Sequence, residues 1–339
     1  MRTSDFDYEL PPERIAQHPV EPRDSARLLV DRGSLGVEHL HVHELDTLLQ
    51  DGDLLVVNDT RVIPARLALH RESGGRVEVL LLEPLTEDSR RAWQALVRPG
   101  GRLRPGEILF DASNRPIVRF EGRSKDDDTF EVEFVPQEDP LDLMEEIGEM
   151  PLPPYITERT AESERYQTVY SRRAASAAAP TAGLHFTPEL LARIAKRGIA
   201  IERVELVVGL DTFKPVSVED PAEHRMHSEW YSVDQSVLTA ASQARRVVAI
   251  GTTAVRSLES AATRGAIQGR TDLFIRRGYD WKVVDLMLTN FHLPRTTLLM
   301  MIDAFVGSRW HDIYASALRH DYRFLSFGDA MLLDRHAPS

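Results

Sequence analysis

Cysteine is absent from the 339-residue chain. Its absence excludes disulfides, thiolate nucleophiles and cysteine-ligated zinc. A long apolar run is also missing, since the longest candidate, residues 298–306, is interrupted by Asp303. Residues 1–7 lack the apolar core of a signal peptide. We therefore expect a cytoplasmic protein that makes no membrane contact.

The usual nucleotide-binding loops are missing as well. No Gly-x-Gly-x-x-Gly follows a predicted strand and no Walker A loop is present, so neither a Rossmann-type site nor a P-loop site is indicated. His39, His41 and His43 alternate along one stretch, but no cluster of carboxylates accompanies them in the sequence. The sequence therefore predicts no metal site.

Positive charge is scarce overall but unevenly distributed. The net charge of −12 argues against a nucleic-acid partner. Residues 126–150, however, hold eleven acidic residues and no Lys or Arg, and outside them 42 acidic residues face 41 basic ones. A short stretch has the opposite bias, with five arginines and no acid: Arg90, Arg91, Arg98, Arg102 and Arg104. Local binding of a polyanion is therefore compatible with the composition, and the acidic segment has no interpretation beyond solubility.

Two kinds of secondary-structure pattern occur along the chain. Short strands separated by Gly and Pro turns are predicted at residues 77–82, 92–97, 117–120 and 130–135, which is typical of a small antiparallel barrel. Elsewhere strands and helices mix: a helix capped by Thr187, a strand at 247–250 leading into a helix that Gly265 closes, a strand at 283–288, and a helix capped by Thr296 or Thr297. We predict a mixed α/β main domain, residues 1–66 plus 151–339, interrupted by a β-barrel domain, residues 67–150. Without a coiled-coil repeat, a monomer is expected.

Four stretches contain candidate site residues. Gly251-Thr252-Thr253 joins a strand to a helix whose first amides favour an anion, with Arg256 one turn later; an ordinary capped helix explains the same pattern. Small residues around Thr181 and His185 favour close ligand approach or a tightly packed turn with a buried histidine. Residues 57–62 and 289–295 indicate either capped turns or recognition loops.

Long matches in the same order make the chain resemble one family. They include VNDTRVIPARL at 57–67, MPLPPYI at 150–156, RYQTVY at 165–170, AAPTAGLHFT at 178–187, and the stretch 289–300. The family is the S-adenosylmethionine:tRNA ribosyltransferase-isomerases of queuosine biosynthesis, and the resemblance covers nearly the whole chain. It implies an α/β domain interrupted by a small β-barrel, in agreement with the predicted organisation.

The resemblance also implies a reaction. The ribosyl part of S-adenosylmethionine moves to the aminomethyl group of 7-aminomethyl-7-deazaguanine at the tRNA wobble position and rearranges. The products are epoxyqueuosine, adenine and methionine. S-adenosylmethionine is consumed as a substrate, and neither a metal nor a further cofactor is implied.

This chemistry assigns tasks to candidate residues. A base must remove a proton from the ribose 5′ carbon beside the sulfonium, and we favour His185, ahead of His227, His292, Asp59 and Glu229. A ring face for the sulfonium is expected from Phe186, Phe291, Trp230 or Tyr231. The methionine carboxylate is expected at Thr252 and Thr253 with Arg256, and adenine at Asn290 or Thr181. Asn58 and Arg61 complete the substrate site. Contacts to tRNA are expected from Arg61 and from Arg66, Arg98, Arg102, Arg104, Arg172 and Arg173.

The chain departs from the family pattern at four positions. Val207 replaces a histidine, Asp211 and Ala175 replace glycines, and Arg277 replaces a proline. Loss of the histidine removes an ionisable group. The alternative hypotheses are therefore a paralogue that binds tRNA or a nucleoside without turnover, and an enzyme acting on a different nucleoside or sulfonium substrate.

Overall fold

The structure of the chain is a computed structural model. It describes residues 1–85, 90–124, 129–158, 163–209 and 215–338, so Asp211 and the acidic run 126–128 lie outside the described residues. The chain forms two compact units. Unit 1 comprises residues 1–60, 154–173 and 179–339, and unit 2 comprises residues 61–153 and 174–178.

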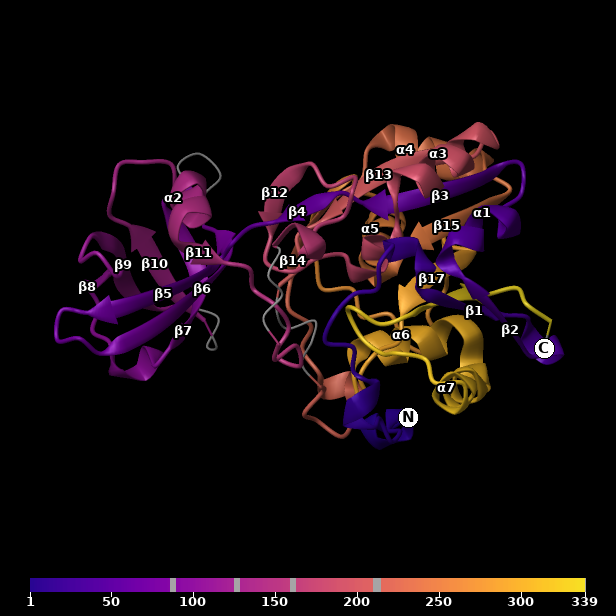
Figure 1. Ribbon diagram of the computed structural model, residues 1–339, viewed down its shortest axis with the longest axis horizontal. Coiled ribbons are helices and arrows are strands. Elements are labelled where there is room, and N and C mark those ends of the chain that lie inside the picture. Colours follow the sequence, from indigo (N-terminus) through magenta and orange to yellow (C-terminus); the bar gives the residue numbers. More distant parts are fainter. Residues whose placement is uncertain (86–89, 125–128, 159–162, 210–214, 339) are drawn as a thin grey trace. The chain divides into compact units, whose positions relative to one another are not determined.

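Unit 1 is built on a nine-stranded mixed sheet (Figure 1). The central strands β13, β3, β15 and β17 run parallel, β18 is antiparallel to β17, and β1 is parallel to β18. In spatial order the strands are β16 (Gln268–Thr271), β14 (Glu229–Ser232), β13 (Ala200–Leu206), β3 (Asp53–Asn58), β15 (Arg246–Ile250), β17 (Leu286–Asn290), β18 (Ala330–Asp334), β1 (Arg27–Asp31) and β2 (Val37–His41). β3 and β15 are rich in Val, Leu and Ile and are buried, as expected for parallel strands covered on both faces.

Helices of unit 1 begin and end where capping chemistry predicts. The Thr187 hydroxyl accepts the Leu190 N–H at the start of α3, and the Thr296 hydroxyl accepts the Leu299 N–H before α6. Gly265 ends α5 in the left-handed conformation, which confirms the predicted helix ends. The α-helices are α1 (Leu45–Leu48), α3 (Pro188–Lys196), α4 (Gln235–Gln243), α5 (Gly251–Arg264), α6 (Thr297–Val306) and α7 (Trp310–Arg319). Within the described residues, none of the helices is both long and apolar enough to cross a bilayer.

The strand predicted at 283–288 begins three residues later, at Leu286. The amides of Val283 and Val284 donate instead to the buried carboxylate of Glu259 on α5, each over 3.0 Å. The Glu259 carboxylate therefore accepts the hydrogen bonds that a neighbouring strand would otherwise accept. The apolar pattern of residues 283–288 does not reveal this partner.

Unit 2 is a closed antiparallel barrel that carries the α-helix α2 (Pro140–Ile147), as labelled in Figure 1. Six strands close the barrel because β5 pairs with both β6 and β8. Their order is β5 (Arg66–Arg71), β6 (Arg76–Pro84), β7 (Ala92–Arg98), β10 (Phe130–Phe134), β9 (Pro116–Arg123) and β8 (Glu107–Phe110), with β11 (Gly148–Glu149) added beside β5. Two further short strands, β4 (Thr60–Val62) and β12 (Arg173–Ser176), pair with each other. The predicted fold class, a mixed α/β domain with a small antiparallel β-barrel, is confirmed.

Candidate active site

A cavity in unit 1 lies at the carboxyl ends of the parallel strands. The turn from β15 into α5 and the end of β17 form two of its walls, and the short 3₁₀ helix η8 (Thr181–His185) forms another. This is where ligands bind in open α/β sheets, because the chain leaves the sheet in loops there. Counting its open mouth, the cavity holds about 600 Å³ of atom-free space. The lining residues are Tyr155, Ala179, Pro180, Thr181, Ala182, Val208, Gly251, Thr252, Thr253, Thr289, Asn290, Phe291, His292, Leu293, Thr296, Leu298, Leu325 and Ser326.

Small residues allow two backbone segments to meet at this cavity. Gly251 has φ +86°, a conformation that side chains disfavour, and a Cβ there would lie 3.5 Å from the Cβ of Ala182. A Cβ on Gly183 would lie only 2.0 Å from the Tyr170 hydroxyl. The small residues at 179–183 thus serve the close packing of η8, and residues 179–182 also line the cavity. Close approach of a ligand to this stretch stays a prediction.

The first turn of α5 presents an anion-binding arrangement. Its leading amides have no intrahelical acceptor, and the helix dipole favours a negative charge at this end. Thr252 and Thr253 line the cavity, and each is only 8% exposed. The Oγ1 atom of Thr253 is buried and has no hydrogen-bond partner among the described residues. A buried hydroxyl without a protein partner beside the first amides of a helix leaves hydrogen-bonding groups that a water or a polar ligand group can use.

Asn290 at the end of β17 connects three walls of the cavity. Its side-chain amide donates to the Leu325 carbonyl over 3.1 Å, and its side-chain oxygen accepts from the Thr181 hydroxyl over 3.0 Å. Leu325 has φ +69°, an unusual conformation for a residue with a Cβ, and this hydrogen bond fixes its carbonyl. Asn290 and Thr181 therefore hold η8 and the 325–326 segment against β17, as well as facing the cavity.

His292 is the histidine at the cavity wall. It is 8% exposed, and its Nε2 lies 3.1 Å from the Thr289 hydroxyl. Burial lowers the pKa of His292 from 6.5 to about 3. The imidazole is therefore neutral at physiological pH, so one of its nitrogens is an unprotonated acceptor.

Burial of His292 makes stability depend on pH. Between pH 6.5 and about pH 3 the unfolded chain binds a proton at His292 and the folded chain does not. The free energy of unfolding is therefore highest above pH 6.5 as far as His292 is concerned, and it decreases as the pH falls. We expect urea unfolding midpoints to decrease from pH 7 to pH 5. The decrease is expected to be smaller in His292→Gln, and an identical pH dependence in both proteins would contradict the assignment.

His185, the base favoured by the sequence, lies elsewhere. Its Nδ1 is 3.1 Å from the Ala182 carbonyl and its Nε2 is 2.9 Å from the Gly328 carbonyl, so both nitrogens face backbone oxygens. Burial lowers the pKa of His185, and the ring borders a separate, smaller cavity with Arg23 and Arg165. This is the buried, hydrogen-bonded histidine that the sequence left as the alternative. The third histidine, His227, is exposed and is not among the lining residues.

Arg256 and Glu229 form a buried ion pair with each other. Their side chains are 7% and 8% exposed, and the Glu229 carboxylate also accepts the Gly209 N–H over 3.2 Å. Neither borders the cavity. The expectation that Arg256 adds charge to the helix-start anion site is not supported, because its guanidinium neutralises a carboxylate on β14 instead.

The remaining substrate candidates of unit 1 have structural contacts. The Asn58 side-chain amide donates to the Leu206 carbonyl over 3.1 Å, and its oxygen accepts the Leu206 N–H over 3.3 Å, which joins the ends of β3 and β13. Burial raises the pKa of Asp59, with Arg203 3.7 Å away. Phe186 is fully buried in the main core, and Tyr231 donates to the Ala266 carbonyl. None of these, nor Trp230, lines the cavity, whereas Phe291 does.

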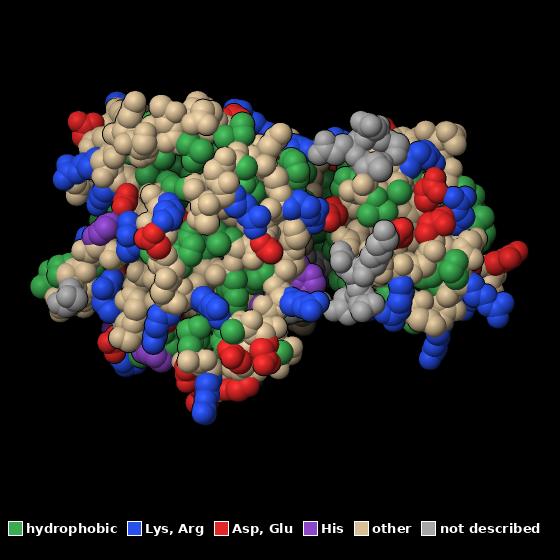
Figure 2. Space-filling view, turned by 180° about the vertical axis from the view of Figure 1, so that it is seen from behind, with side chains coloured by type: hydrophobic (Ala, Val, Ile, Leu, Met, Phe, Trp, Pro, Cys, Tyr) green, Lys and Arg blue, Asp and Glu red, His purple; other side chains and the backbone are tan. Residues whose placement is uncertain are grey.

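The arginines proposed for tRNA divide between the units. Arg172 and Arg173 belong to unit 1, where Arg173 pairs with Glu205 over 2.5 Å. On the face of unit 1 drawn in Figure 2, basic side chains are scattered among acidic ones rather than gathered in one patch. Unit 2 contains Arg61, Arg66, Arg98, Arg102 and Arg104, of which Arg98, Arg102 and Arg104 are exposed on or beside one turn.

Several cavity residues were not singled out from the sequence. Tyr155 and Ser326, whose hydroxyls are 2.7 Å apart, line the cavity, as do Val208 and Leu325. Membership of Tyr155 in MPLPPYI was the available signal. No local pattern marks Ser326, because the fold brings it to the cavity in the segment that connects α7 to β18.

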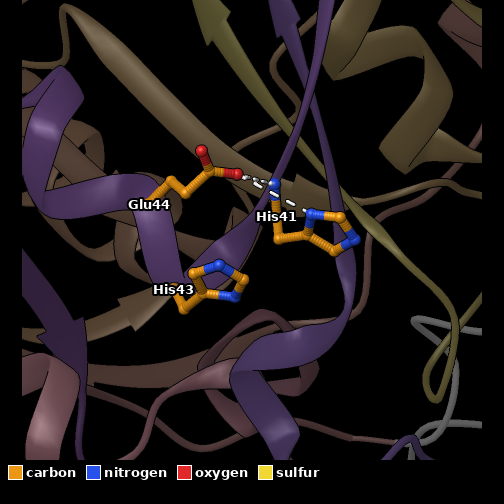
Figure 3. Close-up of side chains that lie close together, drawn as sticks. All are labelled: His41, His43 and Glu44. Carbon is orange, nitrogen blue, oxygen red and sulfur yellow. Dashed lines mark hydrogen bonds and ion pairs between the residues drawn. The ribbon is translucent and has the colours of Figure 1, made fainter.

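One group of potential metal ligands lies outside the cavity. Figure 3 shows the rings of His41 and His43 side by side, with the Glu44 carboxylate directed at His41. The three ligand atoms lie within 4.8 Å of one another, whereas zinc ligands about 2.1 Å from the metal are about 3.4 Å apart. Glu44 also caps the His41 N–H over 2.8 Å. The cap accounts for the carboxylate, so we assign no metal here.

Comparison with known proteins places the chain in a family. The model of the family described as "Queuosine biosynthesis protein" matches residues 3–333. The chain belongs to this family. A relative from Moorella thermoacetica named S-adenosylmethionine:tRNA ribosyltransferase-isomerase is 50% identical, over 98% of this chain and 100% of the relative. A relative of the same name from Symbiobacterium thermophilum is also 50% identical, with the same coverage. The crystal structure of an S-adenosylmethionine tRNA ribosyltransferase from Thermotoga maritima is similar, with a TM-score of 0.54, 38% identity and coverage of 97% of this chain and 99% of that one.

The position of Val207 bears on its departure from the family pattern. Val208 lines the cavity and Val207 does not. The Val207 N–H donates to the Trp230 carbonyl over 2.9 Å, which continues the pairing of β13 with β14, and neighbours on a strand point to opposite faces. Val207 itself does not border the cavity.

We expect Val207→His to change turnover by less than about twofold, because position 207 does not border the cavity. Steady-state rates of the two proteins test this, with Val208→Ala as a matched variant on the wall. A large gain in turnover in Val207→His would show that the missing histidine is a catalytic group.

Proposed function

We propose that this chain transfers the ribosyl part of S-adenosylmethionine to the aminomethyl group of 7-aminomethyl-7-deazaguanine at the tRNA wobble position and isomerises it. The products are epoxyqueuosine in tRNA, adenine and methionine. One observation carries the proposal: segments at 155, 179–182 and 289–293, all within the family-like stretches, meet at one cavity with the start of α5.

His292 is the proposed general base. Removal of a proton from the ribose 5′ carbon leaves the electron pair on that carbon, where the adjacent sulfonium stabilises it. The base must be unprotonated and must reach the cavity. His292 meets both requirements, since its ring is neutral and it lines the wall. The burial that keeps the ring neutral also weakens it as a base, so its position at the cavity is what supports the proposal. His185 meets only the first, because its nitrogens face backbone carbonyls.

The start of α5 is the proposed site for the methionine carboxylate. Free amides, the helix dipole and the hydroxyls of Thr252 and Thr253 supply donors to an anion without a cationic side chain. Phe291 is the aromatic residue of the predicted set that borders the cavity, but its ring is fully buried against Tyr314, Tyr322 and Phe324, so we assign it no contact with the sulfonium. Asn290 and Thr181 remain the proposed contacts of adenine. Both side chains keep hydrogen-bonding groups that the bond between them does not use.

Thr253→Val tests the carboxylate site. The substitution removes the unpartnered hydroxyl and keeps the shape, so we expect the Kd for S-adenosylmethionine to rise about tenfold, the value of one hydrogen bond to a charged group. Calorimetric titration measures it. Thr253→Ser is the matched control and should bind like the parent protein; equal affinity in Thr253→Val would place the carboxylate elsewhere.

Arginines of unit 2 are the proposed tRNA contacts, with Arg98, Arg102 and Arg104 presented together on or beside the turn after β7. Phosphate contacts of this kind make affinity fall with salt. Arg61, Arg66, Arg172 and Arg173 extend the proposal. We further propose that the protein acts as a cytoplasmic monomer with S-adenosylmethionine as a consumed substrate and no other cofactor.

The proposed function is tested by turnover. Protein is mixed with S-adenosylmethionine labelled in the ribose and tRNA carrying 7-aminomethyl-7-deazaguanine. Label in the tRNA together with free adenine is the expected result. Binding of S-adenosylmethionine without its consumption, under conditions where the Thermotoga maritima enzyme is active, would identify a paralogue without turnover.

A further inference from the structure

We infer that Thr289 is a positioning residue that holds the His292 ring with Nδ1 turned to the cavity as the proton acceptor. The inference rests on the proposed role of His292 as base. Thr289 is 1% exposed and pairs with Met331 of β18 in the sheet, so its hydroxyl is a fixed point. That hydroxyl lies 3.1 Å from His292 Nε2.

The backbone of His292 is fixed independently of its ring. Its N–H donates to the Tyr314 hydroxyl over 3.0 Å, and its carbonyl accepts from the Tyr8 hydroxyl over 2.5 Å. Tyr8 comes from the N-terminal segment and Tyr314 from α7, and their rings meet edge to face, 5.1 Å between centroids. With the backbone held and the ring 8% exposed, packing limits the side chain, and the Thr289 hydroxyl is the polar contact that orients its Nε2.

The other ring nitrogen is left for the substrate. Nδ1 of His292 has no hydrogen-bond partner among the described residues, and it is not among the buried polar atoms that lack one. His292 lines the cavity and its Nε2 contacts Thr289, so we assign Nδ1 as the ring nitrogen turned to the open space. Either Nε2 or the Thr289 hydroxyl can be the donor in this contact, and we assign Nε2–H as the donor, which leaves an unshared pair on Nδ1 of the neutral ring. This tautomer is the one that accepts the 5′ proton.

Loss of the Thr289 hydroxyl is expected to alter both the orientation and the tautomer of the His292 ring. In Thr289→Val, which has nearly the same shape, Nε2 loses its only partner and the ring can shift or place its proton on Nδ1. Misplacement of a base by about 1 Å costs up to about 100-fold in rate, and this is the effect that we expect here. Binding of substrate does not use Nε2, so KM should change little.

The experiment compares Thr289→Val, Thr289→Ser and His292→Gln with the parent protein. Each is incubated in D₂O with S-adenosylmethionine and the acceptor tRNA, and recovered S-adenosylmethionine is examined by mass spectrometry for deuterium at the 5′ carbon. Steady-state kcat and KM are measured in parallel. We expect kcat and deuterium incorporation to fall about 10- to 100-fold in Thr289→Val with KM within about twofold, and Thr289→Ser to restore both.

Two failures can be told apart. Normal kcat and incorporation in Thr289→Val, with His292→Gln inactive, would overturn the positioning role and leave His292 as the base. Normal incorporation in His292→Gln would overturn the base assignment itself. A raised KM with unchanged kcat in Thr289→Val would show that the hydroxyl contacts the substrate, which also contradicts the positioning role.

Discussion

His292→Gln is expected to lower kcat by about 10²- to 10⁴-fold, the usual contribution of a positioned general base. Glutamine has an amide where the imidazole has Nε2, so the contact to Thr289 can be kept while the basic nitrogen is removed. Binding of S-adenosylmethionine should persist, because the proposed carboxylate donors lie on α5. Single-turnover release of adenine measures the chemical step and calorimetry measures the binding.

The matched comparison is His185→Gln, made in the same protein. His185 contacts the Ala182 and Gly328 carbonyls and not the cavity, so its replacement is expected to lower stability more than kcat. A reversed result, with His185→Gln inactive though folded and His292→Gln active, would restore the base that the sequence favoured and contradict the present assignment.

Arg256→Met is expected to lower the free energy of unfolding by about 3–5 kcal/mol, because it leaves the Glu229 carboxylate buried without its cation. Urea denaturation measures the change. In the fraction that is folded, the Kd for S-adenosylmethionine should be unchanged within about twofold, since Arg256 does not border the cavity.

The double variant Arg256→Met/Glu229→Gln separates a structural pair from a binding residue. Removal of both charges abolishes the unpaired carboxylate, so most of the lost stability should return. Full stability in Arg256→Met together with a large loss of S-adenosylmethionine affinity would instead show that the guanidinium binds the methionine carboxylate.

Much of the fold was predictable because its signals are local. Thr187 and Thr296 cap helices, Gly265 ends one, and the apolar runs around 78, 95 and 248 are strands, in agreement with the structure. The start of β17 was not predictable, because the Val283 and Val284 amides bind a carboxylate from another helix. Such a partner is distant in sequence and leaves no trace in the local pattern.

The candidate site was predictable in part for the same reason. Thr252, Thr253 and Asn290 stand at ends of predicted parallel strands, and that position alone indicates a shared edge of the sheet. The sequence could not distinguish His185 from His292, because the difference is which ring finds backbone carbonyls and which finds open space. The pairing of Arg256 with Glu229 and the position of Ser326 in the cavity lining also depend on contacts between segments far apart in the sequence.

The most direct test of the proposed active site is a crystal structure of the protein with S-adenosylmethionine bound. The account predicts the methionine carboxylate on the first amides of α5 beside Thr252 and Thr253, with the ribose 5′ carbon within reach of His292 Nδ1. Electron density for the ligand beside His185, or outside the cavity at the ends of β15 and β17, would contradict it.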